Sequence, residues 1–553
     1  MESQLPVKMS DGAILKADVA YPTDPVTGRR APGNFPVLLT QTPYLSTKPT
    51  AGDYFVQHGY IFVTAYVRGT TTSGGNFGFF SKRDAQDGVE LVKWASTQLQ
   101  GSNGQIGLTG GSYAGINQAA TVAEAGRSSP IKALAPYCMG AEFYRETYFA
   151  GGIPTQTLNF QRVIGDSMGG NTAPTGAALV NEINAGGPRA YEGQFWQDRT
   201  PGNLAEKIVD AGVPALLWST NGDIYAQSSL ELYSYLQNAS RKLPTFGPMR
   251  QDQNATGRYQ IVMGQGGHCE NIDQRITMEW FDTWLKGKKT GIEDTSTPLH
   301  AHEMISNRWL NTAAYPVVPA YTRYYLGPNK TLSPVVPAES GRDSAAWAQP
   351  DATSTLQYES PALENGGTLA GPISASVYAS SSTRNLELIA TLQLVGVDGS
   401  TTPISSGTVL GSLAANDPQR SWFDVSGVPV RPYGKFISDE PVPEGSVKKY
   451  DFALSPRFVH IPEGSKLRLT VTTQTPTPRC SPNLGVDPCF PTSPQAGSLQ
   501  GSVVSLHFGP PTRTSLNLPL LKGDCWRSSD NPNPNVPYWK GNLLSGVPGP
   551  CQK

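Results

Sequence analysis

Short runs of apolar residues alternate with amphipathic stretches in the N-terminal quarter of the chain. Residues 36–40 and 60–65 are apolar runs of the length that fully buried strands have. Between residues 84 and 98, apolar side chains recur at the spacing of one helix face. Residues 105–109 form another short apolar run, and a helix is expected through Ala125. This alternation predicts a mainly parallel α/β sheet.

The pattern changes between about residues 141 and 208. This segment is rich in aromatic residues and contains no clear strand, so it is expected to be an inserted, mostly helical cap. The α/β pattern resumes with apolar runs at 215–219 and 260–263, and a helix is expected around 276–285.

Helical periodicity is absent from the last part of the chain, where apolar residues alternate with other residues. The alternation is clearest at 386–394 and 467–471, and turn residues separate the segments at short intervals. This pattern is typical of an all-β sandwich.

A chain of 553 residues is long enough for three or four structural units. We expect an α/β domain in two parts, residues 1–140 and 209–310, interrupted by the cap at 141–208. Residues 311–553 are expected to form the β-sandwich domain.

Composition narrows the choice of partners. The 43 Lys and Arg residues nearly balance 44 Asp and Glu residues, so no strong field attracts nucleic acid or an anionic membrane. Charged residues are only 16% of the chain, and Gly and Pro together are about a fifth, which suits a turn-rich globular protein. No apolar stretch is long enough for a transmembrane helix.

The six cysteines bear on the cellular compartment. Four of them, Cys480, Cys489, Cys525 and Cys551, lie in Pro-rich, loop-like sequence near the end. The simplest of their three possible pairings is Cys480–Cys489 with Cys525–Cys551. Such cysteines favour disulfides and a secreted protein, although the first residues contain no signal-peptide pattern and a cytoplasmic location is the alternative.

Ser112 is the most informative residue for function. It lies in the segment Gly-Gly-Ser-Tyr-Ala-Gly at 110–115, between a predicted strand and a predicted helix. The nucleophile of an α/β-hydrolase occupies such a sharp turn, and small residues two before and two after it let strand and helix pass closely. Gly110 and Ala114 meet this requirement. A purely structural turn is the alternative interpretation.

A serine nucleophile needs a base and an acid that orients the base. Among the six histidines, only His268 lies after Ser112 in a Gly-rich loop just past a predicted α/β strand. Asp223 follows the preceding strand, at the edge where active sites of open α/β sheets gather. His300 and His302, near the domain junction, are the second choice for the base.

The tetrahedral intermediate of acyl transfer needs two hydrogen-bond donors. The backbone N–H of Tyr113 is the standard one, because it follows the nucleophile. Tyr44, after an early strand, could supply a second donor through its hydroxyl, although the sequence alone favours a packing role. Cys269, beside His268, is expected to be a small buried residue rather than a reactive thiol. No cluster of residues has metal-ligand spacing, and no cofactor is expected.

The chain as a whole resembles the X-Pro dipeptidyl-peptidase and cocaine-esterase (CocE/NonD) family of hydrolases. In the α/β region the resemblance is carried by residues 43–44, 68–70, 73–75, 84, 87–88, 94–95, 103–104, 107, 111–115 and 281–287. In the β region it is carried by residues 371–372, 385–395, 398–399 and 462–469.

The resemblance implies a specific architecture and site. Members consist of an α/β-hydrolase domain, a helical cap and a C-terminal jelly roll. The resemblance implies Ser112 as nucleophile, His268 as base and Asp223 as the acid. It also implies that the Tyr44 hydroxyl and the Tyr113 N–H form the oxyanion hole.

Members of the family cleave esters, acyl amides or X-Pro peptide bonds. In α-amino-acid ester hydrolases, two acidic residues just past the catalytic Asp hold the substrate ammonium. Residues 224–226, after Asp223, contain no carboxylate, although Glu142 or Glu146 could substitute. The aromatic residues of the cap suggest a bulky apolar acyl or aryl group, with simple packing of cap helices as the alternative.

We therefore expect a serine hydrolase that cleaves carboxylic esters or amides of small-molecule or lipid-like substrates through an acyl-enzyme. X-Pro dipeptidyl-peptidase or acyl-peptide hydrolase activity is the alternative within catalysis, and the sequence does not separate hydrolysis from acyl transfer to an alcohol. A carbohydrate-binding protein with a vestigial hydrolase is the alternative from another class.

Overall fold

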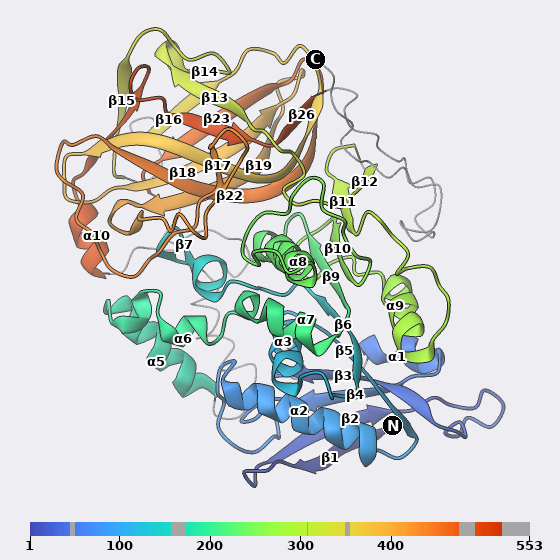
Figure 1. Ribbon diagram of the computed structural model, residues 1–553. Coiled ribbons are helices and arrows are strands. Elements are labelled where there is room, and N and C mark those ends of the chain that lie inside the picture. Colours follow the sequence, from blue (N-terminus) through green and yellow to red (C-terminus); the bar gives the residue numbers. More distant parts are fainter. Residues whose placement is uncertain (45–49, 156–171, 307, 349–353, 475–492, 523–553) are drawn as a thin grey trace.

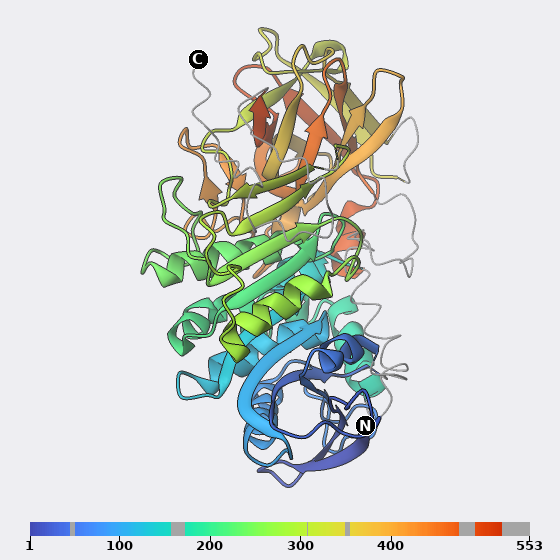
Figure 2. The ribbon, with the colours of Figure 1, turned by 90° about the vertical axis from the view of Figure 1, so that its right-hand side faces the viewer.

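The computed structural model describes residues 1–44, 50–155, 172–306, 308–348, 354–474 and 493–522. Two large sheets dominate it, one in each half of the chain. Figures 1 and 2 show the C-terminal strands gathered in a separate body beside the N-terminal sheet and its helices. No helix in these ranges is long and apolar enough to cross a membrane.

The N-terminal sheet has ten strands in the order β1-β2-β4-β3-β5-β6-β9-β10-β11-β12. From β4 to β11 in this order, neighbouring strands run parallel, while β1, β2 and β12 are antiparallel additions at the two edges. The bounds are Glu2–Lys8 (β1), Ile14–Ala20 (β2), Phe35–Thr42 (β3), Ile61–Tyr66 (β4), Ser102–Gly111 (β5), Ile131–Tyr137 (β6), Ala215–Thr220 (β9), Tyr259–Gly264 (β10), Leu299–Glu303 (β11) and Arg308–Thr312 (β12). The predicted, mainly parallel sheet is therefore present.

Helices cover both faces of this sheet (Figure 1). Their bounds are Thr50–Gln57 (α1), Lys82–Thr97 (α2), Tyr113–Ala125 (α3), Ala205–Ala211 (α7), Ala226–Ser240 (α8) and Gln274–Lys286 (α9). Val37 and Leu39 of β3 belong to the core under α2, α3, α7 and α8, whereas Leu38 belongs to the core under α1 and α9. Because successive side chains of a strand point to opposite faces, one apolar run such as β3 supplies both cores.

The segment between β6 and α7 consists of short elements. They are the π-helix Phe143–Tyr148 (η1), β7 (Phe149–Ala150), β8 (Ile153–Pro154), α5 (Thr172–Asn184), the 3₁₀ turns Pro188–Ala190 (η2) and Pro201–Leu204 (η3), and α6 (Gln194–Gln197). The two-residue strands β7 and β8 pair antiparallel, a feature that the sequence pattern did not predict.

The C-terminal half is rich in strands, as predicted. Twelve strands form one sheet in the order β15-β24-β17-β25-β13-β14-β16-β23-β18-β19, with β22 and β26 also paired to β17. Val504 on β24 and Ile404 on β19, far apart in this order, belong to the same apolar cluster, so the sheet curls around its own core.

The elements of this half have the following bounds. They are Thr322–Gly327 (β13), Pro328–Lys330 (η4), Thr331–Ser333 (β14), Gly341–Ala346 (β15), Thr355–Glu359 (β16), Gly367–Ser381 (β17), Glu387–Val395 (β18), Thr401–Leu410 (β19), Gly411–Leu413 (η5), Trp422–Phe423 (β20), Pro429–Arg431 (β21), Lys448–Ile461 (β22), Lys466–Thr472 (β23), Ser493–Leu499 (α10), Val503–Phe508 (β24), Ser515–Leu518 (β25) and Leu520–Lys522 (β26).

Candidate active site

Ser112 lies on a strained turn between β5 and α3. Its φ is 53° and its ψ is −120°, a region that residues other than glycine rarely adopt. Such a conformation persists only where the surrounding structure enforces it, and it occurs mainly at functional sites. The main-chain N–H of Ser112 donates to the carbonyl of Tyr137 at the end of β6, which fixes the turn against the neighbouring strand.

The residues around Ser112 must be small because strand and helix approach closely. A Cβ added to Gly110 would lie 2.8 Å from Ala114 Cβ and 2.6 Å from Thr40 Oγ1. A Cβ on Gly111 would lie 2.1 Å from the ring of Tyr137. The motif that pointed to a nucleophile in the sequence therefore has a steric cause in the structure.

Two hydrogen-bond donors converge beside Ser112. The hydroxyl of Tyr44 donates to Ser112 Oγ over 3.3 Å, and the Tyr113 N–H lies within hydrogen-bonding reach of the same hydroxyl. Loss of solvent around the hydroxyl raises the pKa of Tyr44 above its ordinary value, although these two hydrogen bonds oppose the shift. Tyr44 is thus held in the protonated form, which can donate a hydrogen bond.

Asp223 and His268 form a hydrogen-bonded pair. His268 Nδ1 lies 3.0 Å from Asp223 Oδ1, and that oxygen also accepts from the Tyr225 N–H at 2.9 Å. The Asp223 side chain is fully buried, while 11% of the His268 side chain is exposed. The ring of Tyr225 packs edge-on against the imidazole, with centroids 5.4 Å apart. The carboxylate therefore fixes both the tautomer and the orientation of the ring.

Parallel strands carry these groups to one edge of the sheet. Ser112 follows β5, Asp223 follows β9 and His268 follows β10, with β6 between β5 and β9. Within the described ranges, the single hydrogen bond of the His268 imidazole is the one to Asp223, and the single hydrogen bond of Ser112 Oγ is the one from Tyr44. Nε2 of His268 is therefore free to accept a proton.

The second-choice histidines do not belong to this site. His300 is buried within β11, where Nδ1 lies 2.7 Å from Asn311 Oδ1 on β12. His302, on the same strand, packs edge-on against Trp309. Both are sheet residues rather than loop residues at the edge that holds Ser112.

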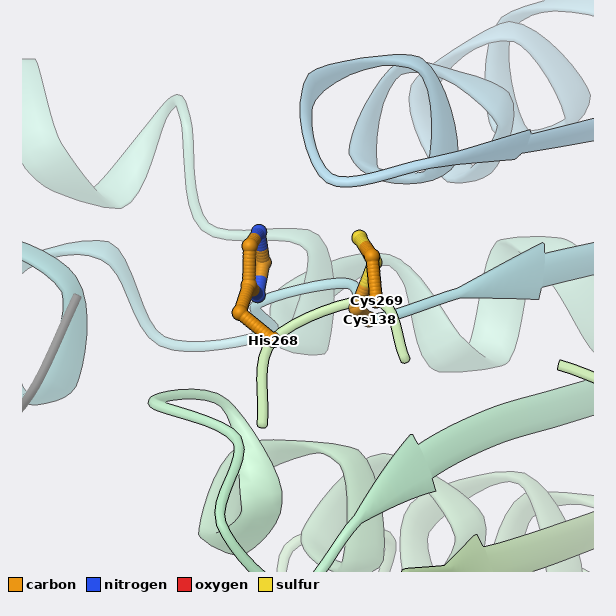
Figure 3. A group of neighbouring side chains, drawn as sticks. All are labelled: Cys138, His268 and Cys269. Carbon is orange, nitrogen blue, oxygen red and sulfur yellow. A yellow bond between two sulfur atoms is a disulfide. The ribbon is translucent and has the colours of Figure 1, made fainter. Parts of the chain in front are cut away.

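The prediction for Cys269 was wrong. Cys269 is half-buried and forms a disulfide with Cys138, 131 residues earlier, with a Cα–Cα distance of 5.2 Å. Figure 3 shows His268 and Cys269 projecting from one loop, with Cys138 beside them. The sequence did not indicate this pairing, because the two cysteines are distant in the chain and meet only where β6 and β10 end. The predicted pairs among Cys480, Cys489, Cys525 and Cys551 lie outside the described residues.

Among the residues that the structure describes, one group of side chains has its metal-ligating atoms within 4.8 Å of one another. It consists of Cys138, His268 and Cys269. A thiolate rather than a disulfide sulfur binds metals. His268 Nδ1 is already engaged by Asp223. In its oxidised form this cluster is therefore a cross-link beside the site and not a metal centre.

The aromatic residues expected to line a substrate pocket are mostly packing residues. Phe143, Tyr144, Tyr148 and Trp196 are almost fully buried and contact one another. They pack into the same core as α2 and α3. Phe160 lies outside the described residues. Within the described ranges, simple packing therefore accounts for this aromatic cluster.

Two buried glutamates of η1 and its N-terminus are already engaged. Glu142 lies 3.4 Å from the guanidinium groups of Arg145 and Arg420. Glu146 accepts from the Ser228 N–H at the start of α8, at 2.8 Å. Burial and the nearby Glu231 raise the pKa of Glu146 well above its ordinary value, so its surroundings disfavour the charged form.

Sequence reasoning missed Tyr225 and Cys138. Tyr225 supplies both a main-chain donor to Asp223 and a ring against His268, and its position two residues after Asp223 was the available signal. Cys138 follows β6 directly, at the same edge as Ser112. Because no strand was predicted over residues 131–137, the sequence pattern held no signal that would bring Cys138 to Cys269.

Comparison with known proteins defines the family. Residues 11–270 match the X-Pro dipeptidyl-peptidase (S15 family) model, and residues 284–485 match the X-Pro dipeptidyl-peptidase C-terminal non-catalytic domain. The chain belongs to this family of serine hydrolases, with an N-terminal catalytic domain and a C-terminal non-catalytic domain rich in strands.

Individual relatives include esterases. The chain is 24% identical to cocaine esterase of a Rhodococcus species over 416 residues, which cover 66% of this chain and 69% of the esterase. A CocE/NonD family hydrolase from Staphylococcus aureus has the same fold, with a TM-score of 0.76 at 18% identity and coverage of 94% of this chain and 93% of that one. An α-amino acid ester hydrolase gives a TM-score of 0.73 at 16% identity, covering 94% and 96%.

Proposed function

We propose that this protein is a serine hydrolase that cleaves carboxylic esters through an acyl-enzyme. In this proposal the N-terminal sheet is an α/β-hydrolase domain (residues 1–140 and 209–310), residues 141–208 form its cap, and residues 311–553 contain a jelly roll. The observation that carries the proposal is the Tyr44 hydroxyl on Ser112 Oγ, at a strained turn and at the same sheet edge as the Asp223–His268 pair.

In the first step, Ser112 Oγ attacks the carbonyl carbon of the ester while its proton moves to His268 Nε2. Asp223 stabilises the imidazolium through Nδ1, as its hydrogen bond in the structure allows. The carbonyl oxygen becomes an oxyanion and receives hydrogen bonds from the Tyr44 hydroxyl and the Tyr113 N–H. The donors are in place before the reaction, so little reorganisation is needed.

The tetrahedral intermediate then collapses. The bond between the carbonyl carbon and the leaving oxygen breaks, and the His268 proton passes to the departing alcohol. A water molecule gives a proton to His268 and attacks the acyl carbon. In the second tetrahedral intermediate the bond from the acyl carbon to Ser112 Oγ breaks, His268 returns the proton to Oγ, and the carboxylic acid is released. The cycle consumes only ester and water.

The charges around the site favour an ester without an α-ammonium group. Residues 224–226 contribute no carboxylate. Arg145 and Arg420 match the charge of Glu142, and the raised pKa of Glu146 disfavours a charged carboxylate at that position. An ammonium group would therefore find no unmatched anion among these residues.

Cleavage of X-Pro peptide bonds is the second candidate, favoured by the family model that matches residues 11–270. The same nucleophile and donors would serve, with an amine as leaving group. Parallel assays with p-nitrophenyl acetate and butyrate and with a Gly-Pro p-nitroanilide distinguish the two. We expect ester turnover at least tenfold above turnover of the anilide in kcat/KM.

A disulfide beside the site also supports the proposal that the protein functions in an oxidising compartment outside the cytoplasm.

The decisive experiment labels the protein with a fluorophosphonate and identifies the modified peptide by mass spectrometry. We expect the label on Ser112, and we expect S112A to lose both labelling and ester hydrolysis while keeping its circular dichroism spectrum. A neighbouring hydroxyl offers a matched control, since T109S should label like the wild type. Ester turnover retained by folded S112A would refute the assignment.

A further inference from the structure

The Cys138–Cys269 disulfide joins two parts of the site that the catalytic steps require to be fixed relative to one another. Cys138 directly follows β6, the neighbour of β5, and β5 ends one residue before Ser112. Cys269 directly follows His268. Figure 3 shows His268 and Cys269 next to one another on their loop, with Cys138 beside Cys269.

The Cys138 end of the bond is rigid. Cys138 is fully buried, and its N–H donates to the carbonyl of Trp218 on β9 at 2.7 Å. The carbonyl of the preceding residue, Tyr137, accepts from the Ser112 N–H at 3.1 Å. Cys138 is therefore part of the same hydrogen-bonded edge that holds the nucleophile.

Among the described residues, hydrogen bonds attach the loop around His268 to the sheet before His268 but not after it. Before His268, the Thr220 hydroxyl donates to the carbonyls of Gly266 and Gly267 at 2.7 and 2.9 Å. In the part of the chain that the structure describes, the hydrogen bonds made after His268 and before α9 remain inside the loop: the Glu270 N–H donates to the Gly267 carbonyl, and the Glu270 carboxylate accepts from the Gly267 N–H. The disulfide supplies the attachment on this second side.

We infer that the Cys138–Cys269 disulfide positions His268 for proton transfer with Ser112, so that catalysis depends on the oxidised state of this pair. The inference rests on the proposed function, since it assigns a role only if His268 is the base. The two cysteines are positioning residues, because their effect is transmitted through the imidazole. Displacing a reacting group by about 1 Å can cost about 10² in rate.

Reduction breaks the S–S bond between Cys138 and Cys269 and so removes this attachment of the loop. A phosphine reductant gives two electrons to the S–S bond, water supplies two protons and the oxygen, and the products are two thiols and a phosphine oxide. Freed from Cys138, the loop residues after His268 are held next at Ile272, which packs against the core under α1 and α9 just before α9 begins. The imidazole then keeps its hydrogen bond to Asp223 but loses its fixed distance from Ser112.

The test begins with a digest under non-reducing conditions, in which mass spectrometry should find the Cys138 and Cys269 peptides linked. The kcat and KM for p-nitrophenyl butyrate and the rate of fluorophosphonate labelling at Ser112 are then measured with and without a phosphine reductant. EDTA is present throughout, because free thiols at Cys138 and Cys269 beside His268 would bind zinc.

The double variant C138A/C269A is the matched control. The other four cysteines lie elsewhere in the chain, so any effect of the reductant on this variant reports on them. We expect reduction of the wild type to lower kcat and the labelling rate about 10- to 100-fold, with KM changed less than twofold. The double variant should show the same low kcat in both conditions.

Near-ultraviolet circular dichroism separates positioning from folding. If kcat fell only in proportion to the loss of folded protein, in the reduced wild type or in the double variant, the inference would be wrong. It would also be wrong if the reduced enzyme stayed folded and its kcat lay within twofold of that of the oxidised enzyme. Failure of the proposed function looks different, because the oxidised wild type would then show neither ester turnover nor labelling of Ser112.

Discussion

Ser112 and Tyr44 show how a single residue can be prepared for chemistry by its neighbours. The main chain of Ser112 is held at a positive φ by the hydrogen bond to Tyr137 and by the small residues around it. The strain turns Oγ toward the Tyr44 hydroxyl instead of toward the helix that follows. The hydroxyl donor and the proposed nucleophile are thus close together before substrate arrives, which is the arrangement that electrostatic catalysis requires.

The role of Tyr44 can be tested by removing one oxygen. Tyr44→Phe deletes the donor and keeps the ring, so we expect kcat for p-nitrophenyl butyrate to fall about 10²–10³-fold, as when one oxyanion-hole donor is lost. KM should change little, because the hydrogen bond strengthens as charge develops. Tyr137→Phe is the control, since that ring packs beside Gly111 from the neighbouring strand. Equal losses in the two variants would contradict the assignment.

Individual residues differ in how far the sequence could place them. Ser112, Asp223 and His268 each follow a strand of one parallel sheet, so their placement at one edge of that sheet could be predicted from the predicted strands. The Cys138–Cys269 bond could not, because it depends on how β6 and β10 end in space. The aromatic residues around Trp196 were ambiguous for a related reason, since composition does not distinguish a packed cluster from a pocket wall.

At the scale of elements, β18 buries a polar residue that the alternating pattern, with its apolar side chains at even-numbered positions, does not assign to the core. Glu387, at the start of this strand, is buried and accepts a hydrogen bond from Trp347 Nε1 at 3.1 Å. Burial raises its pKa to about 7, and the Trp347 hydrogen bond opposes the shift only in part. A carboxyl that is harder to ionise in the folded state makes stability depend on pH.

The sign of that dependence follows from linkage. Between the ordinary carboxyl pKa and about 7, the folded protein holds a proton at Glu387 that the unfolded chain has lost, so stability falls as pH rises through this window. Glu387→Gln keeps an oxygen for Trp347 and cannot ionise. We expect the variant to be more stable than the wild type at pH 8, by roughly 2–3 kcal/mol, and nearly equal at pH 4.5. Urea unfolding at the two pH values measures this, and equal differences at both would contradict it.

Element boundaries were predictable where periodicity is strong and not where the backbone is irregular. The predicted helix at 84–98 corresponds to α2, Lys82–Thr97, and the alternating run at 386–394 corresponds to β18. The π-helix Phe143–Tyr148 has no such signature, because its wide turn depends on buried partners. Tyr144, for example, donates to the Ala190 carbonyl 46 residues later.

At the scale of the whole molecule, the C-terminal half contacts the very elements that hold the site. Asn221, two residues before Asp223, donates to the His302 carbonyl and accepts from the Phe458 N–H on β22. Arg431 on β21 makes a two-pronged ion pair with Glu231 on α8, the helix that begins just after Asp223. The strand-rich half therefore supports the Asp223 turn, a relation that no local pattern in the sequence reveals.

The Arg431–Glu231 pair provides a test of that support. Both side chains are almost fully buried, so removing one partner leaves an unpaired charge in the interior, at a cost of about 3–5 kcal/mol. We expect Arg431→Met to lower the melting temperature and to split a single calorimetric transition into two, because the two halves lose a buried, two-pronged ion pair. The double variant R431M/E231Q should recover part of the loss, since the introduced amide carries no charge and can still accept from the Tyr235 hydroxyl. The variant could instead unfold in one transition, with a free energy of unfolding within about 1 kcal/mol of the wild-type value. The ion pair would then not couple the two halves, and the hydrogen bonds of Asn221 would have to couple them.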